Sequence, residues 1–272
     1  PASHQRLQQA LEYALLAAGK RTRPLLSFAA ARAMGQTTDG WLIPAQAVEM
    51  IHTYSLIHDD LPAMDDDQWR RGRPTTHIAF SEATAILAGD ALQCMAFQVL
   101  AESDPLGASA PQRLSWVRQL AIASGQLGMV DGQAIDCDAQ GQIDTLAALE
   151  TMHRKKTGAL IGAAVLMGAG SAEHPPNESE QAALTQYADA LGLAFQVMDD
   201  VLDVTADTAT LGKDAGSDAA ANKVTYVSLM GMAAAQARTR ELHEEALAAL
   251  VHLPGKVYAL QAIADFIIAR AK

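Results

Sequence analysis

The chain has 272 residues, of which 50% are hydrophobic and only 5% are aromatic, and its formal net charge is −11. This length is ample for a buried core, and an apolar half with 19% charged residues is not a disordered composition. The acidic balance argues against nucleic acid as a partner, because no basic stripe dominates the chain. An anionic substrate would need divalent cations to reverse the local charge.

The cysteine usage and the longest apolar runs favour a cytoplasmic protein without a membrane span. Cys94 and Cys137 have no metal-ligand spacing, so we expect buried thiols that pack in a reducing compartment. The longest apolar stretches, such as 159–169, are well short of a membrane span. Because the chain starts at Pro1 without a methionine, we expect that a short N-terminal piece precedes it.

Hydrophobic residues recur every three to four positions through most of the chain, as in 7–15, 86–99 and 184–195, and alternating strand patterns are nearly absent. Clusters of Gly and Pro predict breaks at 19–24, 35–40, 72–74, 104–111, 170–176, 212–216 and 254–255. Two segments, 46–60 and 187–203, are apolar on nearly every face, which is typical of helices at the centre of a bundle. We predict one all-α domain over 1–272, with about ten helices around a central cleft.

The first acidic cluster, DDLPAMDDD at 59–67, is followed at once by the basic run RRGRP at 70–74. A run of acids is usually a solvated surface, but this one follows the apolar run 51–57. Carboxylates at the end of a buried helix raise one another's pKa values unless a cation neutralises them. Clustered oxygen ligands suit Mg²⁺, with Mn²⁺ as a substitute, rather than zinc. Because Pro62 excludes a regular helix, Asp65 must return to the site through a bulged turn.

The second acidic cluster is Asp199, Asp200 and Asp203, which also closes an apolar helix. At about 3.6 residues per turn, Asp199 and Asp203 share a helix face and Asp200 lies beside them. One such motif is weak evidence, because acids at this spacing occur on ordinary surfaces. Two motifs at the ends of two buried helices are stronger evidence that their acids hold several metal ions around one diphosphate.

A basic segment, KRTRP at 20–24, places three cations within four residues at the predicted start of a helix. Such a segment is either a polar loop between helices or a diphosphate site formed by the cations and free backbone N–H groups. The residues alone leave both interpretations open.

Two Glu-x-x-His pairs, Glu49 with His52 and Glu150 with His153, raise a different hypothesis. A di-iron carboxylate bundle uses two such pairs and one further Glu from each of two other helices. That hypothesis leaves both aspartate motifs and the basic segment without a role.

With these residues assembled, the chain resembles the trans-prenyl diphosphate synthases, most closely the bacterial enzymes that make farnesyl diphosphate. The segment HDDLPAMDD at 58–66 with RRG at 70–72 is similar to the first aspartate-rich motif of the family in its bacterial form. The segment 199–203 is similar to the second motif, and the resemblance extends nearly from end to end. It implies the isoprenoid synthase fold and a homodimer.

The resemblance also implies a role for each site residue. Three Mg²⁺ ions would be held mainly by Asp59, Asp65 and Asp199, with assistance from Asp60, Asp200 and Asp203. The allylic diphosphate would contact the metals and Arg70, Lys156, Lys213 and Lys223. Isopentenyl diphosphate would be bound by Lys20, Arg23, His52 and Arg71. The groups expected to act on the reacting atoms are Lys156, Thr157, Gln196 and Lys213.

Within the family, the residues just ahead of the first motif limit product length. Tyr54 and Ser55 lie five and four positions before Asp59, and the aromatic residue resembles the farnesyl-making form. The alternatives are a geranylgeranyl diphosphate synthase, a non-catalytic subunit of a prenyl synthase, and a terpene cyclase. Non-catalytic subunits commonly lack an acidic motif, and cyclases usually carry a different second motif, so the residues present favour the synthase.

Overall fold

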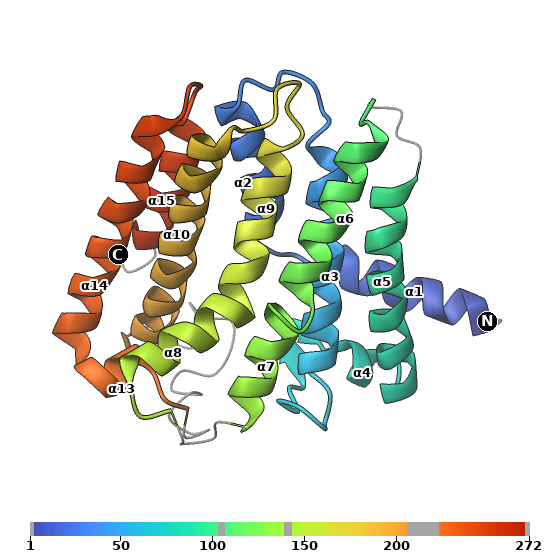
Figure 1. Cartoon of the computed structure of the whole chain (residues 1–272). Helices are drawn as coiled ribbons and strands as arrows, with labels where there is room; N and C mark the ends of the chain where they lie inside the picture. Colours follow the sequence, from blue (N-terminus) through green and yellow to red (C-terminus); the bar gives the residue numbers. More distant parts are fainter. Residues whose placement is uncertain (1–2, 103–106, 139–142, 206–222, 270–272) are drawn as a thin grey trace.

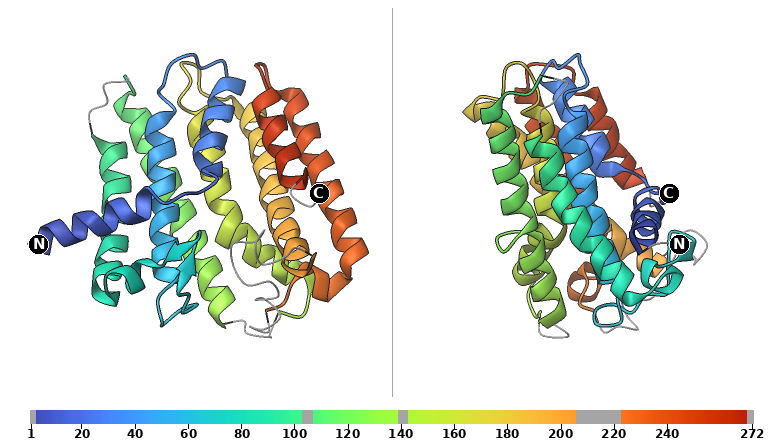
Figure 2. Two further views of the ribbon diagram at one scale, coloured as in Figure 1. Left: turned by 180° about the vertical axis from the view of Figure 1, so that it is seen from behind. Right: turned by 90° about the vertical axis from the view of Figure 1, so that its right-hand side faces the viewer.

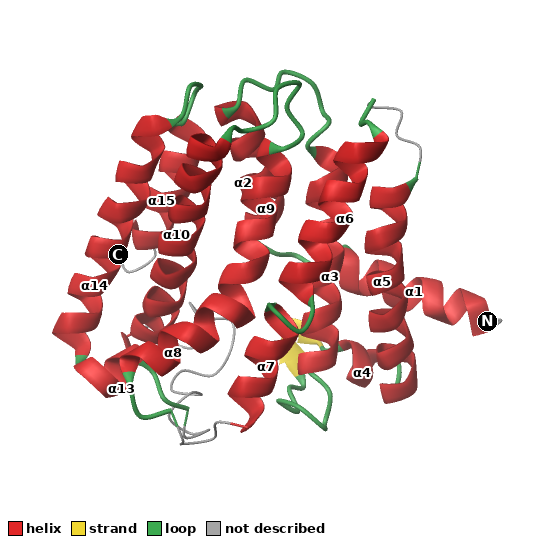
Figure 3. Cartoon of the chain, in the orientation of Figure 1, coloured by secondary structure: helices red, strands yellow, loops and turns green. Residues whose placement is uncertain are grey.

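The computed structural model of the chain describes residues 3–102, 107–138, 143–205 and 223–269. Nearly all of these residues lie in helices that pack into one bundle (Figures 1 and 3). The α-helices are α1 Ser3–Leu15, α2 Thr22–Ala33, α3 Leu42–Asp59, α4 Thr76–Ala79, α5 Glu82–Ala101, α6 Ala110–Ser124, α7 Met129–Asp138, α8 Leu146–His153, α9 Ala159–Ala169, α10 Glu178–Thr205, α13 Tyr226–Met230, α14 Met232–Ala249 and α15 Tyr258–Ala269. The predicted all-α fold class is therefore confirmed.

Three details depart from the sequence analysis. A single turn of π-helix, η1 (Arg154–Gly158), joins α8 to α9, and a 3₁₀ turn, η2 (Leu250–His252), follows α14. A two-residue hairpin pairs β1 (Trp69–Arg70) with β2 (Arg73–Pro74) in antiparallel register. Its turn places Arg71 at φ 54° and Gly72 at φ 76°. A break was predicted at 72–74, but no strand was, because two residues are too few to show alternation.

The two segments predicted to lie at the centre of the bundle do so. Helix α3 packs against α2, α5 and α9, and α10 packs against α9, α14 and α15. Both helices begin at the same end of the bundle and finish at the other, so their aspartate-bearing C-terminal ends face the same direction (Figure 1). The hydrophobic core runs continuously through these helices, with Ile51, Leu191 and Val197 almost fully buried.

Helices α1 and α5 form one side of the molecule. Helix α1 runs across the long axis of the bundle, and its N-terminal end projects beyond α5 (Figure 2). Among the described residues, α5 alone has the length and composition of a membrane-spanning helix. In the structure it packs against α3 as one of the helices of the bundle.

The prediction of buried thiols is wrong, because Cys94 and Cys137 are both exposed. Both follow small or polar neighbours on helix faces that the core does not cover. The residues beside each cysteine did not show whether the thiol lies on the buried or the exposed face of its helix.

Candidate active site

The first acidic motif begins where α3 ends. The chain turns back at Pro62, and the backbone N–H of Asp65 donates to the carbonyl oxygen of Asp59 at 2.9 Å. Asp66 takes up a left-handed conformation with φ 53°. This geometry confirms the predicted bulged turn, which returns Asp65 to the end of the helix beside Asp59.

The carboxylates of this motif repel one another but differ in exposure: Asp60 is buried, Asp59 is half-buried and Asp65 is exposed. The pKa of Asp59 is raised to about 6, chiefly by burial and also by the charges of Asp65 and Asp60, while Lys156 and Arg70 oppose the shift. Burial likewise raises the pKa of Asp60, although its Oδ1 accepts a hydrogen bond from Nε of Arg70 at 2.6 Å. Burial thus outweighs the nearby positive charges at these carboxyls, and a bound cation would favour their ionised form.

The second acidic motif lies on the last turns of α10. Asp200 and Asp203 are buried, with exposed fractions of 6% and 3%. Oδ2 of Asp200 accepts the backbone N–H of Tyr226 at 2.7 Å, which fixes the start of α13. Just before α13, Nζ of Lys223 lies 3.8 Å from Oδ1 of Asp65. The segment that follows residue 222 thus contacts both acidic motifs.

The π-helix turn η1 presents Lys156 and Thr157 to the same region. Nζ of Lys156 donates to Oδ2 of Asp136 on α7 at 2.5 Å. Helix α7 reaches this turn because it carries Gly132 at the contact, where a Cβ would lie 2.2 Å from the backbone nitrogen of Lys156. Single π-turns inside helices are frequent at functional sites because they re-aim side chains.

Gln196 lies between the second motif and η1. Its Nε2 lies 3.3 Å from Nδ1 of His153, to which it donates, and His153 stacks on Tyr226 with ring centroids 5.7 Å apart. Burial lowers the pKa of His153 to about 4, so the ring is neutral at pH 7. A neutral Nδ1 accepts the amide hydrogen bond and orients Gln196.

The basic segment and the hairpin turn meet around one buried carboxylate. NH1 of Arg21 donates to Oε1 of Glu49 at 2.7 Å, and the guanidinium of Arg71 occupies the space that Gly19 leaves without a side chain. The pKa of His52 falls well below its ordinary value because of burial and because four arginines surround it. Burial lowers the pKa of Arg23 to about 10, although Glu49 opposes the shift.

This cluster has the features of an anion site. The Nε of Arg23 is buried and makes no hydrogen bond within the described residues. Lys20 lies in the same loop, between α1 and α2. Several cations held together in a partly buried place, with a donor atom unsatisfied, favour a diphosphate as the ligand.

A cavity of about 500 Å³ extends between the basic segment and the first acidic motif. It is lined by His52, Tyr54, Ser55, Asp59, Lys156 and Thr157, together with Arg23 from the basic segment. The sequence analysis missed the apolar wall, which comes largely from α7 and includes Met129, Val130 and Ala134. No charged motif marks this wall, and α7 has no clear apolar stripe that would have placed it there. Of the predicted site residues, Lys213 lies outside the described residues.

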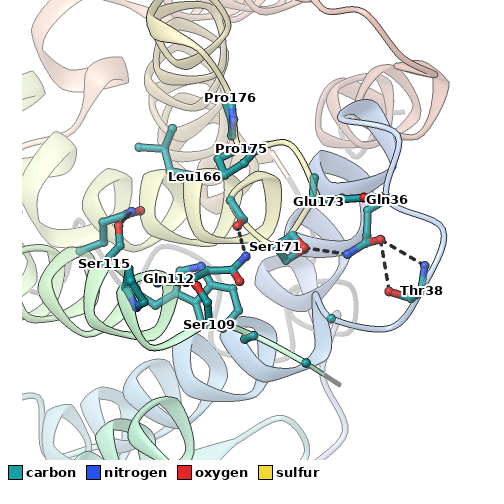
Figure 4. Close-up of a pocket in the computed structure, with 18 of the residues that line it drawn as sticks. Gln36, Thr38, Ser109, Gln112, Ser115, Leu166, Ser171, Glu173, Pro175 and Pro176 are labelled. Atoms are coloured by element: carbon teal, nitrogen blue, oxygen red, sulfur yellow. Dashed lines mark hydrogen bonds between the residues drawn. The ribbon is translucent and has the colours of Figure 1, made fainter. Parts of the chain in front are cut away.

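A second cavity of about 760 Å³ lies at the opposite end of the bundle (Figure 4). Its wall comes from the α2–α3 and α9–α10 loops and the start of α6. Gln36 donates to the carbonyl of Ser171 at 2.6 Å, and Gln112 donates to that of Gly170 at 2.5 Å. None of the predicted site residues lines it, so we place the candidate site at the aspartate end.

The di-iron hypothesis is not supported, because the side chains it needs as metal ligands are paired with other residues. Glu49 is paired with Arg21, Glu150 lies 3.4 Å from Arg238, and His153 accepts from Gln196. In the part of the chain that the structure describes, no three His, Cys, Asp or Glu side chains converge to hold a metal ion. The described aspartates of the two acidic motifs likewise form no such group of three. This is compatible with Mg²⁺, which is usually held by one or two carboxylates together with water and substrate phosphates.

Comparison with known proteins agrees with the resemblance seen in the sequence. Over 267 residues the chain is 50% identical to farnesyl diphosphate synthase of Escherichia coli, a match that covers 97% of this chain and 89% of that protein. It is 43% identical over 265 residues to geranylgeranyl diphosphate synthase of Cyanophora paradoxa, covering 97% and 87% of the two chains.

Solved structures agree as well. Geranyltransferase from Helicobacter pylori, determined with magnesium and isoprenyl diphosphate, superposes with a TM-score of 0.85 at 31% identity, and the match covers 100% of this chain and 89% of that one. The fold is therefore that of the isoprenoid synthases. Residues 4–260 match the model of the polyprenyl synthetase family, and the chain belongs to that family.

Proposed function

We propose that the chain is a farnesyl diphosphate synthase, which condenses isopentenyl diphosphate with dimethylallyl diphosphate and then with geranyl diphosphate. The observation that carries the proposal is the single cavity that combines Asp59 and Lys156 with the basic residues Arg23 and His52 and with the aromatic ring of Tyr54. A diphosphate-bearing apolar chain needs this combination, with charge at one end and apolar walls along the rest.

The aspartates of both motifs suit Mg²⁺. Asp59 is half-buried beside Asp65 and Asp60, and its pKa is raised to about 6, chiefly by burial and also by the charges of these two neighbours. We assign the metal ligands to Asp59, Asp60, Asp65, Asp199, Asp200 and Asp203. Three Mg²⁺ ions, with Mn²⁺ as a substitute, would withdraw charge from the leaving diphosphate.

The protein residues divide between two diphosphate sites. We assign the allylic diphosphate to Arg70, Lys156 and Lys223, which lie near the aspartates of the first motif, and to Lys213, which lies outside the described residues. We assign isopentenyl diphosphate to Lys20, Arg23, His52 and Arg71, which need no metal. The neutral state of His52 follows from its lowered pKa and leaves a ring that can donate one hydrogen bond without adding charge.

The reaction proceeds by ionisation, condensation and elimination. Lys156 and Arg70 stabilise the departing diphosphate, so that the C–O bond of the allylic substrate breaks. We assign the oxygen atoms of Thr157 and Gln196 to stabilisation of the allylic cation. The double bond of isopentenyl diphosphate attacks the cation, and the released diphosphate removes the proton. Met129, Val130 and Leu160 keep water away from the cation.

We further propose a single catalytic domain, a homodimer and a cytoplasmic location. Exposed apolar side chains on α5 and α6 support the dimer, since Ile86, Leu87 and Leu114 are 44%, 57% and 68% exposed. Exposed large apolar side chains on neighbouring helices favour a protein partner. Light scattering during size-exclusion chromatography is expected to give twice the chain mass, and Leu114→Glu is expected to shift the mass toward the monomer.

Product analysis tests the catalytic proposal. Protein stripped with EDTA and given both substrates is expected to make farnesyl diphosphate only after Mg²⁺ is added, as read by mass spectrometry. If the protein with Mg²⁺ made no prenyl product longer than its substrates, it would be a non-catalytic subunit. A main product of geranylgeranyl diphosphate would move the assignment to that synthase, a class that also occurs among the relatives. A cyclic hydrocarbon formed from farnesyl diphosphate alone would identify a terpene cyclase.

A further inference from the structure

His58 stands immediately before the first acidic motif, and no step of the proposed reaction uses it. Its side chain lines the same cavity as Tyr54. The two residues are one turn apart on α3, and their rings meet edge to face, with centroids 5.7 Å apart and an interplanar angle of 74°. This geometry is favourable because the positive edge of one ring meets the negative face of the other. His58 therefore supports one side of the Tyr54 ring.

Helix α5 holds the imidazole in this position. Nε2 of His58 donates to the carbonyl oxygen of Ile86 at 3.2 Å. The ring fits against α5 only because residue 89 is glycine, since a Cβ there would lie 2.1 Å from Nε2 and 2.6 Å from Cδ2 of His58. Real Cβ atoms do not approach other atoms so closely, so any larger residue at 89 must displace the imidazole.

We propose that His58, seated on Gly89, is a positioning residue that holds the Tyr54 ring across the cavity and thereby sets the product length. The inference rests on the proposed function, in which Tyr54 limits the growing chain. A ring that stops a growing chain must resist being pushed aside. The imidazole packs against the Tyr54 ring, and α5 fixes the imidazole in turn. Gly89 on α5 thereby becomes a specificity-determining position, although it does not line the cavity.

The deciding variant is His58→Ala, assayed with dimethylallyl and isopentenyl diphosphates by mass spectrometry of the products. We expect the ratio of geranylgeranyl to farnesyl diphosphate to rise about three- to tenfold, the range that corresponds to the loss of one edge-to-face contact. In the Tyr54→Ala background, His58→Ala is expected to add nothing, because His58 acts through the ring of Tyr54. Such non-additivity is the mark of two residues that act as one unit.

A second variant reaches the same contact from the other helix. Gly89→Ala is expected to expel the imidazole from its seat and shift the ratio in the same direction. Gly162→Ala is the matched control, because it makes the same change within a helix and its Cβ meets no atom within 4 Å. Its product ratio is expected to equal that of the unmodified protein. Thermal melting followed by circular dichroism establishes that each variant is folded.

The product ratio separates positioning from mere structural support, since lost stability lowers total turnover without lengthening the product. Unchanged ratios in folded His58→Ala or Gly89→Ala protein would overturn the inference, as would a His58→Ala shift that persists in full beside Tyr54→Ala. Failure of the proposed function is distinguishable, because the unmodified protein would then not make farnesyl diphosphate at all.

Discussion

Asp200 accepts the backbone N–H of Tyr226 at 2.7 Å, so an acid of the second motif also holds the first turn of α13. Asp200 is 6% exposed and Tyr226 is fully buried. The hydrogen bond ties the end of α10 to the segment that carries Lys223, which in turn lies 3.8 Å from Asp65 of the first motif. Asp200 therefore has two expected roles, as a metal ligand and as the acceptor that holds α13, and substitutions can separate them.

Substitutions of Asp200 are expected to separate its effect on stability from its effect on Mg²⁺ binding. Asp200→Ala leaves the Tyr226 N–H without an acceptor and is expected to lower the free energy of unfolding by about 1–3 kcal/mol. Asp200→Asn keeps an oxygen acceptor, so its stability is expected to stay closer to that of the unmodified protein. Both variants lose a negative charge and are expected to need more Mg²⁺ for half-maximal rate. Urea unfolding and Mg²⁺ titrations measure the two effects. Equal stability of the Ala and Asn variants would show that the hydrogen bond does not hold α13.

The contact between α7 and the π-turn is expected to tolerate no side chain at Gly132. A Cβ there would lie 2.2 Å from the backbone nitrogen of Lys156, so Gly132→Ala must move one element away from the other. Overpacking of this kind costs about 1–3 kcal/mol. Displacement of Lys156 is also expected to raise the KM for the allylic diphosphate. Steady-state kinetics and thermal melting provide the measurements.

Gly162→Ala controls for the effect of the added methyl group, since its Cβ meets no atom within 4 Å. It is expected to be neutral or slightly stabilising, as alanine is the better helix former by about 1 kcal/mol. If Gly132→Ala behaved like Gly162→Ala in both assays, the close approach of α7 to Lys156 would be disproved.

His153 is expected to make the protein less stable in acid. Burial lowers its pKa from 6.5 to about 4, so between these values the unfolded chain binds the proton more readily than the folded one. Stability from this group is therefore present above pH 6.5 and is lost as the pH falls toward about 4. Between pH 7 and pH 5 the loss is about 2 kcal/mol.

The measurement is urea unfolding at both pH values for the unmodified protein and for His153→Gln. The variant has no group at residue 153 that titrates in this window and keeps an acceptor for Gln196, so its stability is expected to change less between pH 7 and pH 5. An identical pH dependence in the two proteins would show that His153 is not held neutral.

Much of the fold and the charged part of the site followed from the sequence, because both depend on short-range patterns. The apolar runs before Asp59 and Asp199 predicted two central helices, and Pro62 predicted the turn that returns Asp65 to the helix end. These inferences need only helical periodicity and the geometry of proline.

The remaining features depend on contacts between segments far apart in the chain. Nothing in the sequence around Gly132 indicates that α7 forms the apolar wall, because the glycine has meaning only where the backbone of Lys156 crosses it. The same is true of Gly89 and the imidazole of His58. The π-turn that presents Lys156 was also unpredicted, since it differs from an α-helix by one residue and leaves no clear change in periodicity.

Tyr54 is expected to set the length of the product. Its side chain is 5% exposed and lines the cavity, five residues before Asp59 and thus about 7.5 Å from it along α3. Burial raises the pKa of Tyr54 to about 12, so the ring carries no charge that would draw water into the cavity. Tyr54→Ala is expected to open space beneath the growing chain and to shift the product from farnesyl toward geranylgeranyl diphosphate.

Two measurements make this test decisive. Removal of a buried aromatic side chain can cost about 3–5 kcal/mol, so thermal melting must first show that Tyr54→Ala is folded. Tyr54→Phe serves as the matched control, because it keeps the ring and is expected to stop at farnesyl diphosphate. Condensation by both variants is expected to remain dependent on Mg²⁺, since the aspartates are unchanged. A folded Tyr54→Ala protein that still stopped at farnesyl diphosphate would show that another helix forms the floor, and that the aromatic residue before Asp59 does not determine the product.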